Sequence, residues 1–175
     1  MNIKRNISII GGAGHVGFPL GLIFSSKGFR VSLIDIHAKN IEKINKGKVP
    51  FLEENSQSIL KKALKNKKIF ATKKLDEVLN SKYIIICIGT PITNNLNPSL
   101  RSFINFFHQL NFFLKKDHVV IIRSSIYPGI CNKIYEIIKK KCNNLSYCPE
   151  RIVQGKSISE LPKLPQLISG KNKKA

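Results

Sequence analysis

The sequence lacks an uninterrupted apolar run long enough to cross a membrane. Residues 7–22 form an apolar segment, but several glycines, His15 and Pro19 interrupt it, whereas a membrane-spanning helix needs about 20 apolar residues in succession. The same glycines fall where a secretory signal peptide would carry its apolar region. The pattern argues against a membrane protein and against a secreted one, so we expect the protein to be cytoplasmic.

Cysteine is scarce as well. The four cysteines are Cys87, Cys131, Cys142 and Cys148, and their spacing matches neither a CxxC redox pair nor a zinc-binding pattern. Cys87 and Cys148 lie at the ends of apolar runs, where a cysteine usually behaves as a small buried hydrophobic residue. We therefore expect reduced thiols, as in the cytosol, and no metal site.

Acidic residues are few. The chain has 10 Asp and Glu residues against 30 Lys and Arg residues, which gives a net charge of +20. Such an excess permits nucleic-acid binding through phosphate contacts, or it reflects a solvated basic surface. The lysines are spread along the chain and are not interleaved with aromatic residues, as a base-stacking groove requires. We expect the charge to attract anionic nucleotides, without a specific nucleic-acid partner.

Short apolar runs alternate with segments of helical periodicity along almost the whole chain. Strands are expected at residues 6–10, 29–34, 69–72, 83–88, 118–122 and 145–148, and helices at 15–27, 39–46, 54–65, 75–79, 100–114 and 128–141. This alternation predicts an α/β fold with a doubly wound, mostly parallel sheet, that is, a Rossmann domain. We expect this domain to span residues 1–170, followed by a frayed polar tail at 171–175.

A GxGxxG motif, from Gly12 to Gly17, joins the first expected strand to the helix that follows it. In a dinucleotide-binding turn, Gly12 would permit the tight turn and Gly14 would let a pyrophosphate approach the backbone. Gly17 would let the helix pack closely on the strand. His15 and Val16 lie at the helix N-terminus, where free N–H groups and the positive dipole end attract phosphates.

The residue that closes the second strand, Asp35, favours NAD as the cofactor. In this position an acidic side chain accepts hydrogen bonds from the adenosine ribose, and its charge repels the extra phosphate of NADP. Lys39 and His37 lie nearby and keep NADP open as the alternative. A glycine-rich turn with no ligand is the other alternative, because the motif alone is weak.

Five segments together resemble the UDP-glucose/GDP-mannose dehydrogenase family, in its order and spacing. They are GGAGHVGFPLG, IDIHAKNIEKINKGKVPFLEE, CIGTPI, IIRSSIYPG and CPERIVQGKSISELPKLPQLISG, so the resemblance covers residues 6–171. The last segment is most similar to the branch that oxidises UDP-N-acetyl-D-mannosamine or similar N-acetyl sugars.

The resemblance implies an NAD-dependent oxidoreductase that acts on a UDP-sugar. The family oxidises the C6 alcohol to a carboxylate in two hydride transfers with two NAD molecules, for surface polysaccharide precursors. A cysteine thiolate captures the aldehyde stage, and the thioester is then hydrolysed.

The resemblance also implies roles for residues at the ends of later strands. Gly89, Thr90 and Pro91 match the turn beside the nicotinamide-side ribose. Ser124 and Ser125 match a Ser-Thr pair, in which Ser124 contacts the cofactor and the Ser125 hydroxyl positions a water or the substrate oxygen. For both serines, turn and helix-cap chemistry is the alternative.

Glu150 matches a glutamate thought to assist the attack of water on the thioester, as a general base. A surface loop acid is the alternative for this residue. In the family, a lysine and an asparagine come from a central helix, and the nucleophilic cysteine and the sugar-nucleotide pocket come from a distal domain, all beyond residue 175. Cys148 matches a non-catalytic position.

We therefore expect a truncated chain that is inactive alone. Full-length relatives are homodimers, largely through the central helix, and we expect no such dimer here. The alternative is a stand-alone NAD-binding module without catalysis.

Overall fold

The computed structural model of the chain describes residues 5–89, 100–152, 154–173 and 175. Its centre is a seven-stranded sheet in the order β3-β2-β1-β4-β5-β6-β7. The strands are β1 (Asn6–Ile10), β2 (Arg30–Ile34), β3 (Ile69–Thr72), β4 (Tyr83–Ile86), β5 (Val119–Ile122), β6 (Leu145–Tyr147) and β7 (Ser169–Gly170). The first six strands are parallel, and β7 pairs antiparallel with β6.

The strand order reverses between β1 and β4. β1 pairs with β2 on one side, where Ile10 lies opposite Ile34, and with β4 on the other, where Ile10 lies opposite Ile86. The connections that leave these two neighbours run in opposite directions along the sheet, so a crevice opens outside their carboxyl ends. This reversal is the topology of a doubly wound Rossmann sheet, as predicted.

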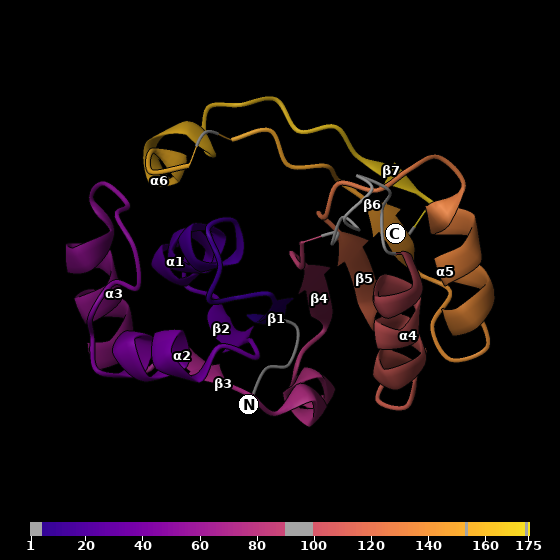
Figure 1. Cartoon of the computed structure of the whole chain (residues 1–175), viewed down its shortest axis with the longest axis horizontal. Coiled ribbons are helices and arrows are strands. Elements are labelled where there is room, and N and C mark those ends of the chain that lie inside the picture. The colour runs from indigo at the N-terminus through magenta and orange to yellow at the C-terminus, as the bar shows by residue number, and fades with distance from the viewer. Residues whose placement is uncertain (1–4, 90–99, 153, 174) are drawn as a thin grey trace.

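Helices cover both faces of the sheet (Figure 1). They are α1 (Gly17–Ser26), α2 (Ala38–Asn45), α3 (Ser56–Lys65), the 3₁₀ helix η2 (Leu75–Asn80), α4 (Leu100–Asn111), α5 (Ile130–Ile138) and α6 (Ser157–Glu160). Phe18, Ile44 and Leu60 bring α1, α2 and α3 into one apolar cluster. Phe107 and Ile134 bring α4 and α5 into a second cluster on the opposite face.

The segment after β6 crosses above the sheet to α6, beside α1, and returns to β7 (Figure 1). Leu161 follows α6 and is buried in the cluster of α1. Neither α6 nor β7 was predicted. The tail expected to fray begins with two residues that are held in place, because the Lys171 N–H donates to the Leu145 carbonyl (2.9 Å) and Asn172 Nδ2 donates to the Asn143 carbonyl (2.7 Å).

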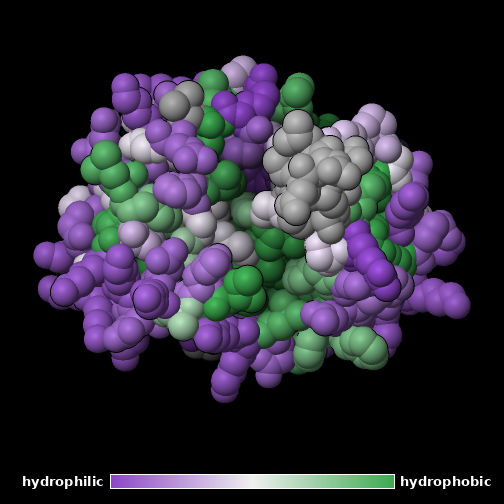
Figure 2. All heavy atoms as spheres, in the orientation of Figure 1, coloured by the Kyte–Doolittle hydropathy of each residue, from purple (hydrophilic) through white to green (hydrophobic). Residues whose placement is uncertain are grey.

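Hydrophilic side chains cover most of the margin of the face seen in Figure 2, and apolar residues gather toward its middle. Among the described residues, none of the helices combines the length and the apolar character that a membrane span requires.

Candidate functional site

The glycine-rich turn follows β1 at the carboxyl edge of the sheet. Gly11 has a φ of +77°, and a Cβ there would lie 2.6 Å from the Cys87 carbonyl oxygen. The N–H groups of Gly11 and Gly12 both donate to the Ile34 carbonyl, at 2.9 and 3.1 Å. The left-handed residue of the turn is therefore Gly11, which lies just before the GxGxxG motif.

The three motif glycines are required for different reasons. A Cβ on Gly12 would lie 2.7 Å from Leu33 Cα in β2, and a Cβ on Gly17 would lie 2.4 Å from the Gly11 carbonyl oxygen. A Cβ on Gly14 would meet only that same oxygen, at 3.3 Å. Gly12 and Gly17 thus allow close packing of backbone on backbone, whereas Gly14 leaves its outer side open. An open backbone at this position fits a pyrophosphate that approaches the turn.

The start of α1 leaves backbone donors without acceptors. The helix begins at Gly17 rather than at His15, and no side chain caps it. Within the described part of the chain, the N–H groups of His15, Val16 and Gly17 have no hydrogen-bond acceptor. Free N–H groups at a helix N-terminus, together with its dipole, form an anion site. The residues present therefore fit the phosphates of a dinucleotide.

Asp35 follows β2, and its carboxylate accepts a hydrogen bond from the glycine-rich turn. Its Oδ2 accepts a hydrogen bond from the Ala13 N–H (2.9 Å), and its Oδ1 accepts one from the His37 N–H (3.0 Å). The same Ala13 peptide is bound on its other side, because Asn40 Nδ2 donates to the Ala13 carbonyl (3.3 Å). Each carboxylate oxygen has a second lone pair, so Asp35 can still accept from ribose hydroxyls. The hydrogen bond from Asn40 to Ala13 was not predicted.

The His15 side chain is exposed and stacks on Phe51, with ring centroids 3.9 Å apart. Phe51 also meets the edge of Phe18 from α1, at 5.7 Å. These contacts attach the segment before α3 to the glycine-rich turn. No periodicity or spacing in the sequence signals them.

The ends of β4 and β5 lie beside the turn at the same edge of the sheet. Ser124 is buried and donates from Oγ to the Ile88 carbonyl (2.6 Å), so its hydroxyl fixes the backbone just before Gly89. A Cβ on Gly89 would meet no atom within 4 Å. Ser125 is exposed. Thr90 and Pro91 lie outside the described residues.

Glu150 follows β6 and pairs with Arg123 at the end of β5. Oε2 of Glu150 accepts from Arg123 Nε at 3.0 Å and also from Nη2, and Oε1 accepts from the Arg151 N–H at 2.8 Å. The two paired side chains are 7% and 9% exposed, so Glu150 is not a surface loop acid. Arg123 was missed from the sequence.

Arg123 also binds two groups besides Glu150. Its Nη1 donates to Cys148 Sγ (3.0 Å) and to Gln166 Oε1 (3.1 Å). The guanidinium thus links the ends of β5 and β6 to the segment that returns to β7. Cys148 is buried as predicted, but its sulfur belongs to a polar network.

A family model described as "UDP-glucose/GDP-mannose dehydrogenase family, NAD binding domain" matches residues 5–175. The chain belongs to this family. It is 29% identical over 175 residues to the UDP-N-acetyl-D-mannosamine dehydrogenase of Methanococcus maripaludis, a match that covers 98% of this chain and 40% of that relative. It is 26% identical to the UDP-glucose 6-dehydrogenase of Rickettsia bellii, over 97% of this chain and 39% of that relative.

Solved structures of the same family have the same fold. The UDP-D-ManNAc dehydrogenase of Pyrococcus horikoshii superposes with a TM-score of 0.88 at 26% identity, covering 97% of this chain and 42% of that one. The GDP-mannose dehydrogenase of Pseudomonas aeruginosa gives 0.80 at 26% identity, covering 90% and 38%. The Rossmann fold and the NAD cofactor are confirmed, and the chain spans about 40% of the length of the curated relatives it matches.

Three of the four cysteines in this NAD-binding domain are poor nucleophiles at neutral pH. Burial raises the pKa of the Cys87 thiol to about 12, and burial also raises the pKa of Cys131 and of Cys142. A thiol reacts as its thiolate, so a raised pKa lowers the reactive fraction.

Proposed function

We propose that this chain is the NAD-binding portion of a nucleotide-sugar 6-dehydrogenase. The reaction is the oxidation of a UDP-sugar C6 alcohol to a uronate in two NAD-dependent steps, in the cytoplasm, for surface polysaccharide precursors. UDP-N-acetyl-D-mannosamine is the preferred substrate and UDP-glucose is the second candidate. The observation that carries the proposal is the uncapped start of α1, whose three free N–H groups follow closely after Ala13, the residue whose N–H donates to Asp35.

Each strand end binds a different part of NAD. The N–H groups from His15 to Gly17 bind the pyrophosphate, and Asp35 binds the adenosine ribose. The turn that begins at Gly89, held by Ser124, borders the nicotinamide-side ribose. NAD, when bound, accepts the hydride that leaves the oxidised carbon.

For hydrolysis of the thioester we assign Glu150 as the general base and Ser125 as the group that positions water. Two Arg123 donors occupy Oε2 of Glu150, whereas Oε1 accepts one hydrogen bond, from the Arg151 N–H, so Oε1 keeps a lone pair that can take a proton from water. Ser125 is exposed at the same edge of the sheet.

We further propose that the 175 residues do not suffice for turnover. The reaction needs a thiolate to capture the aldehyde. Burial raises the pKa of Cys87, Cys131 and Cys142, and Cys148 is 6% exposed, so that its sulfur is shielded from a substrate. We therefore expect the nucleophile to come from a group outside this sequence. A stand-alone NAD-binding module is the alternative function.

Two measurements on the purified chain test the proposal. Calorimetry should show binding of NAD, and a chain that does not bind NAD would refute the assignment of the cofactor site. The chain should then be incubated with NAD and UDP-N-acetyl-D-mannosamine or UDP-glucose while NADH absorbance is followed. We expect no sustained NADH production. Two NADH per sugar would show that these residues contain a complete active site.

A further inference from the structure

Basic side chains gather at the amino edge of the sheet, opposite the glycine-rich turn. Arg5 precedes β1, Arg30 begins β2, and Lys67 and Lys68 precede β3. These three strands are neighbours and parallel, so their amino ends meet at one edge. The order of the sheet therefore brings together charges that are far apart in the sequence.

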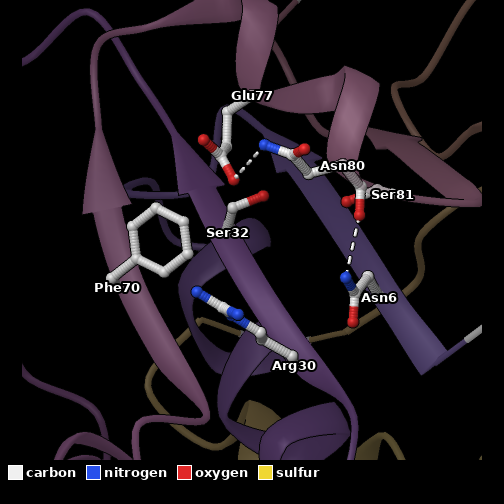
Figure 3. Close-up of a pocket in the computed structure, with 7 residues that line it drawn as sticks. All are labelled: Asn6, Arg30, Ser32, Phe70, Glu77, Asn80 and Ser81. Carbon is white, nitrogen blue, oxygen red and sulfur yellow. Dashed lines mark hydrogen bonds between the residues drawn. The ribbon is translucent and has the colours of Figure 1, made fainter. Parts of the chain in front are cut away.

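The basic residues line a groove formed by three adjoining hollows. The largest has a volume of about 380 Å³ and is lined by Arg5, Arg30, Asn66, Lys67 and Lys68, among others. It shares Asn6 and Arg30 with a hollow of about 220 Å³ (Figure 3), and it shares Asn66 and Lys68 with one of about 310 Å³. The three hollows adjoin through these shared residues, and we call them together the amino-edge groove.

Two of the basic side chains of the amino-edge groove, Arg5 and Lys67, form no hydrogen bond or ion pair within the described residues. Lys68 Nζ donates to the Gly28 carbonyl (3.2 Å) and stays beside the groove. Among the described lining residues, Glu77 is the one acid, and it accepts from Asn80 Nδ2 (3.1 Å). A concave surface of one charge concentrates ions of the opposite charge.

We propose that the amino-edge groove binds the phosphate groups of a small oligophosphate, with a diphosphate as the recognised unit. Arginine forks and lysine ammonium groups together match adjacent phosphates, and charge-assisted hydrogen bonds to them are the strong ones. The site is distinct from the NAD site, because the glycine-rich turn lies at the opposite edge of the same sheet. Ligands at the two edges can therefore be bound at the same time.

The aromatic content of the groove argues against a nucleic acid. Single-stranded nucleic acids bind through bases stacked on exposed aromatic faces. Phe70 is the aromatic residue among the described lining residues, and the Arg30 guanidinium lies over its ring at 5.9 Å from the centroid (Figure 3). One ring, already in contact with Arg30, is not the series of stacking platforms that successive bases require.

The test is a titration of the whole chain with inorganic pyrophosphate, in saturating NAD and about 0.15 M salt, followed by the backbone amide resonances in NMR. The amides of Gly28, Asn66, Lys67 and Lys68 should shift, whereas those of the glycine-rich turn should not. Lys67→Glu should raise the Kd at least about tenfold. Lys67→Asn removes the charge with a residue that tolerates the left-handed backbone there, where φ is 54°, and it should also raise the Kd.

Lys133→Glu is the matched control, because Lys133 is exposed on α5 and the substitution changes the net charge equally. The Kd should stay within about twofold of the unsubstituted chain in this variant. The proposal is overturned if the groove amides do not shift, or if Lys133→Glu weakens binding as much as Lys67→Glu. It is also overturned, in favour of nucleic-acid binding, if a single-stranded RNA binds the same amides more tightly than pyrophosphate at the same salt concentration.

Discussion

Arg123 donates from Nε to Oε2 of Glu150 at 3.0 Å, and both side chains are more than nine-tenths buried. Taking two charges out of water costs free energy, and the pair offsets this cost only while both partners are present. The arrangement therefore makes Glu150 dependent on Arg123 for its place at the carboxyl edge of the sheet.

Replacement of Arg123 by Met should lower the free energy of unfolding by about 3–5 kcal/mol, because it leaves the buried Glu150 carboxylate unpaired. The double variant Arg123→Met/Glu150→Gln should recover a large part of this loss, since no buried charge is then left alone. Urea denaturation of both variants measures the two changes.

The exposed pair of Lys139 and Glu136 is the control for the buried pair. Its side chains are 41% and 63% exposed, and such pairs contribute about 0.2–1 kcal/mol. Lys139→Met should therefore change the stability little. A single Arg123→Met variant that is as stable as Lys139→Met would contradict the role of the buried pair.

We predict that substitutions at two glycines of the turn affect stability and cofactor binding separately. Gly12→Ala forces a Cβ to within 2.7 Å of Leu33 Cα and should lower the free energy of unfolding by about 1–3 kcal/mol, as overpacking does. Gly14→Ala meets one atom at 3.3 Å and should lower it by less than about 1 kcal/mol.

Gly14→Ala should instead weaken NAD binding at least tenfold, which is about 1.4 kcal/mol, because the new methyl group stands where the pyrophosphate approaches. Denaturation without NAD and calorimetry with NAD measure the two effects. If Gly14→Ala binds NAD as tightly as the unsubstituted chain, the pyrophosphate does not lie at this turn.

The parallel strands were predictable from the sequence because each is a short, mostly apolar run, and β4 and β5 are continuous ones, as a sheet buried on both faces favours. The run at Tyr83–Ile86 is an example. β7 was not predictable, since its two residues, Ser169 and Gly170, are exposed and pair with β6 through backbone groups alone. The short helix α6 has no periodicity of its own, and its first residues are held by Glu53, from a distant part of the chain.

The site was predictable where a local motif carries it, as in the GxGxxG turn and the acid that closes β2. Arg123 escaped prediction because its partners are distant in sequence, with Glu150 lying 27 residues away. A basic residue that follows an apolar run also looks like the start of a solvent-exposed loop. The positive φ of Gly11 escaped prediction because the motif begins one residue later.

Asp35 should set both the affinity and the choice of cofactor. Asp35→Ala removes an acceptor for the ribose hydroxyls and should weaken NAD binding by about 1–3 kcal/mol, the scale of a lost hydrogen bond to a charged group. Calorimetry of the unsubstituted chain should show tighter binding of NAD than of NADP. Equal or tighter binding of NADP would refute the role of Asp35.

A loss of NAD affinity in Asp35→Ala can have a second cause, because Asp35 also accepts a hydrogen bond from the Ala13 N–H and so supports the turn. Asn40→Ala separates the two effects, since it breaks the bond to the Ala13 carbonyl and leaves the Asp35 carboxylate in place. We expect a smaller loss of NAD affinity for Asn40→Ala than for Asp35→Ala. Equal losses would mean that Asp35 supports the turn and does not contact the ribose.

The last prediction concerns pH and the buried His118, which is 2% exposed and whose Nδ1 accepts from the Lys115 N–H at 3.1 Å. Burial lowers the pKa of His118, the charge of Lys115 lowers it further, and Asp117 opposes the shift. The folded state thus keeps His118 neutral at a pH where the unfolded chain, with a histidine pKa of about 6.5, takes up a proton. The free energy of unfolding should therefore fall as the pH drops below about 6.5, until the pKa of the folded state is passed.

His118→Asn, which can still accept from Lys115, should lose less stability between about pH 7 and 5 than the unsubstituted chain, as urea denaturation at several pH values would show. The exposed His108 is the control, and His108→Asn should keep the full pH dependence. If His118→Asn loses as much stability with falling pH as the unsubstituted chain, His118 is not the group that titrates.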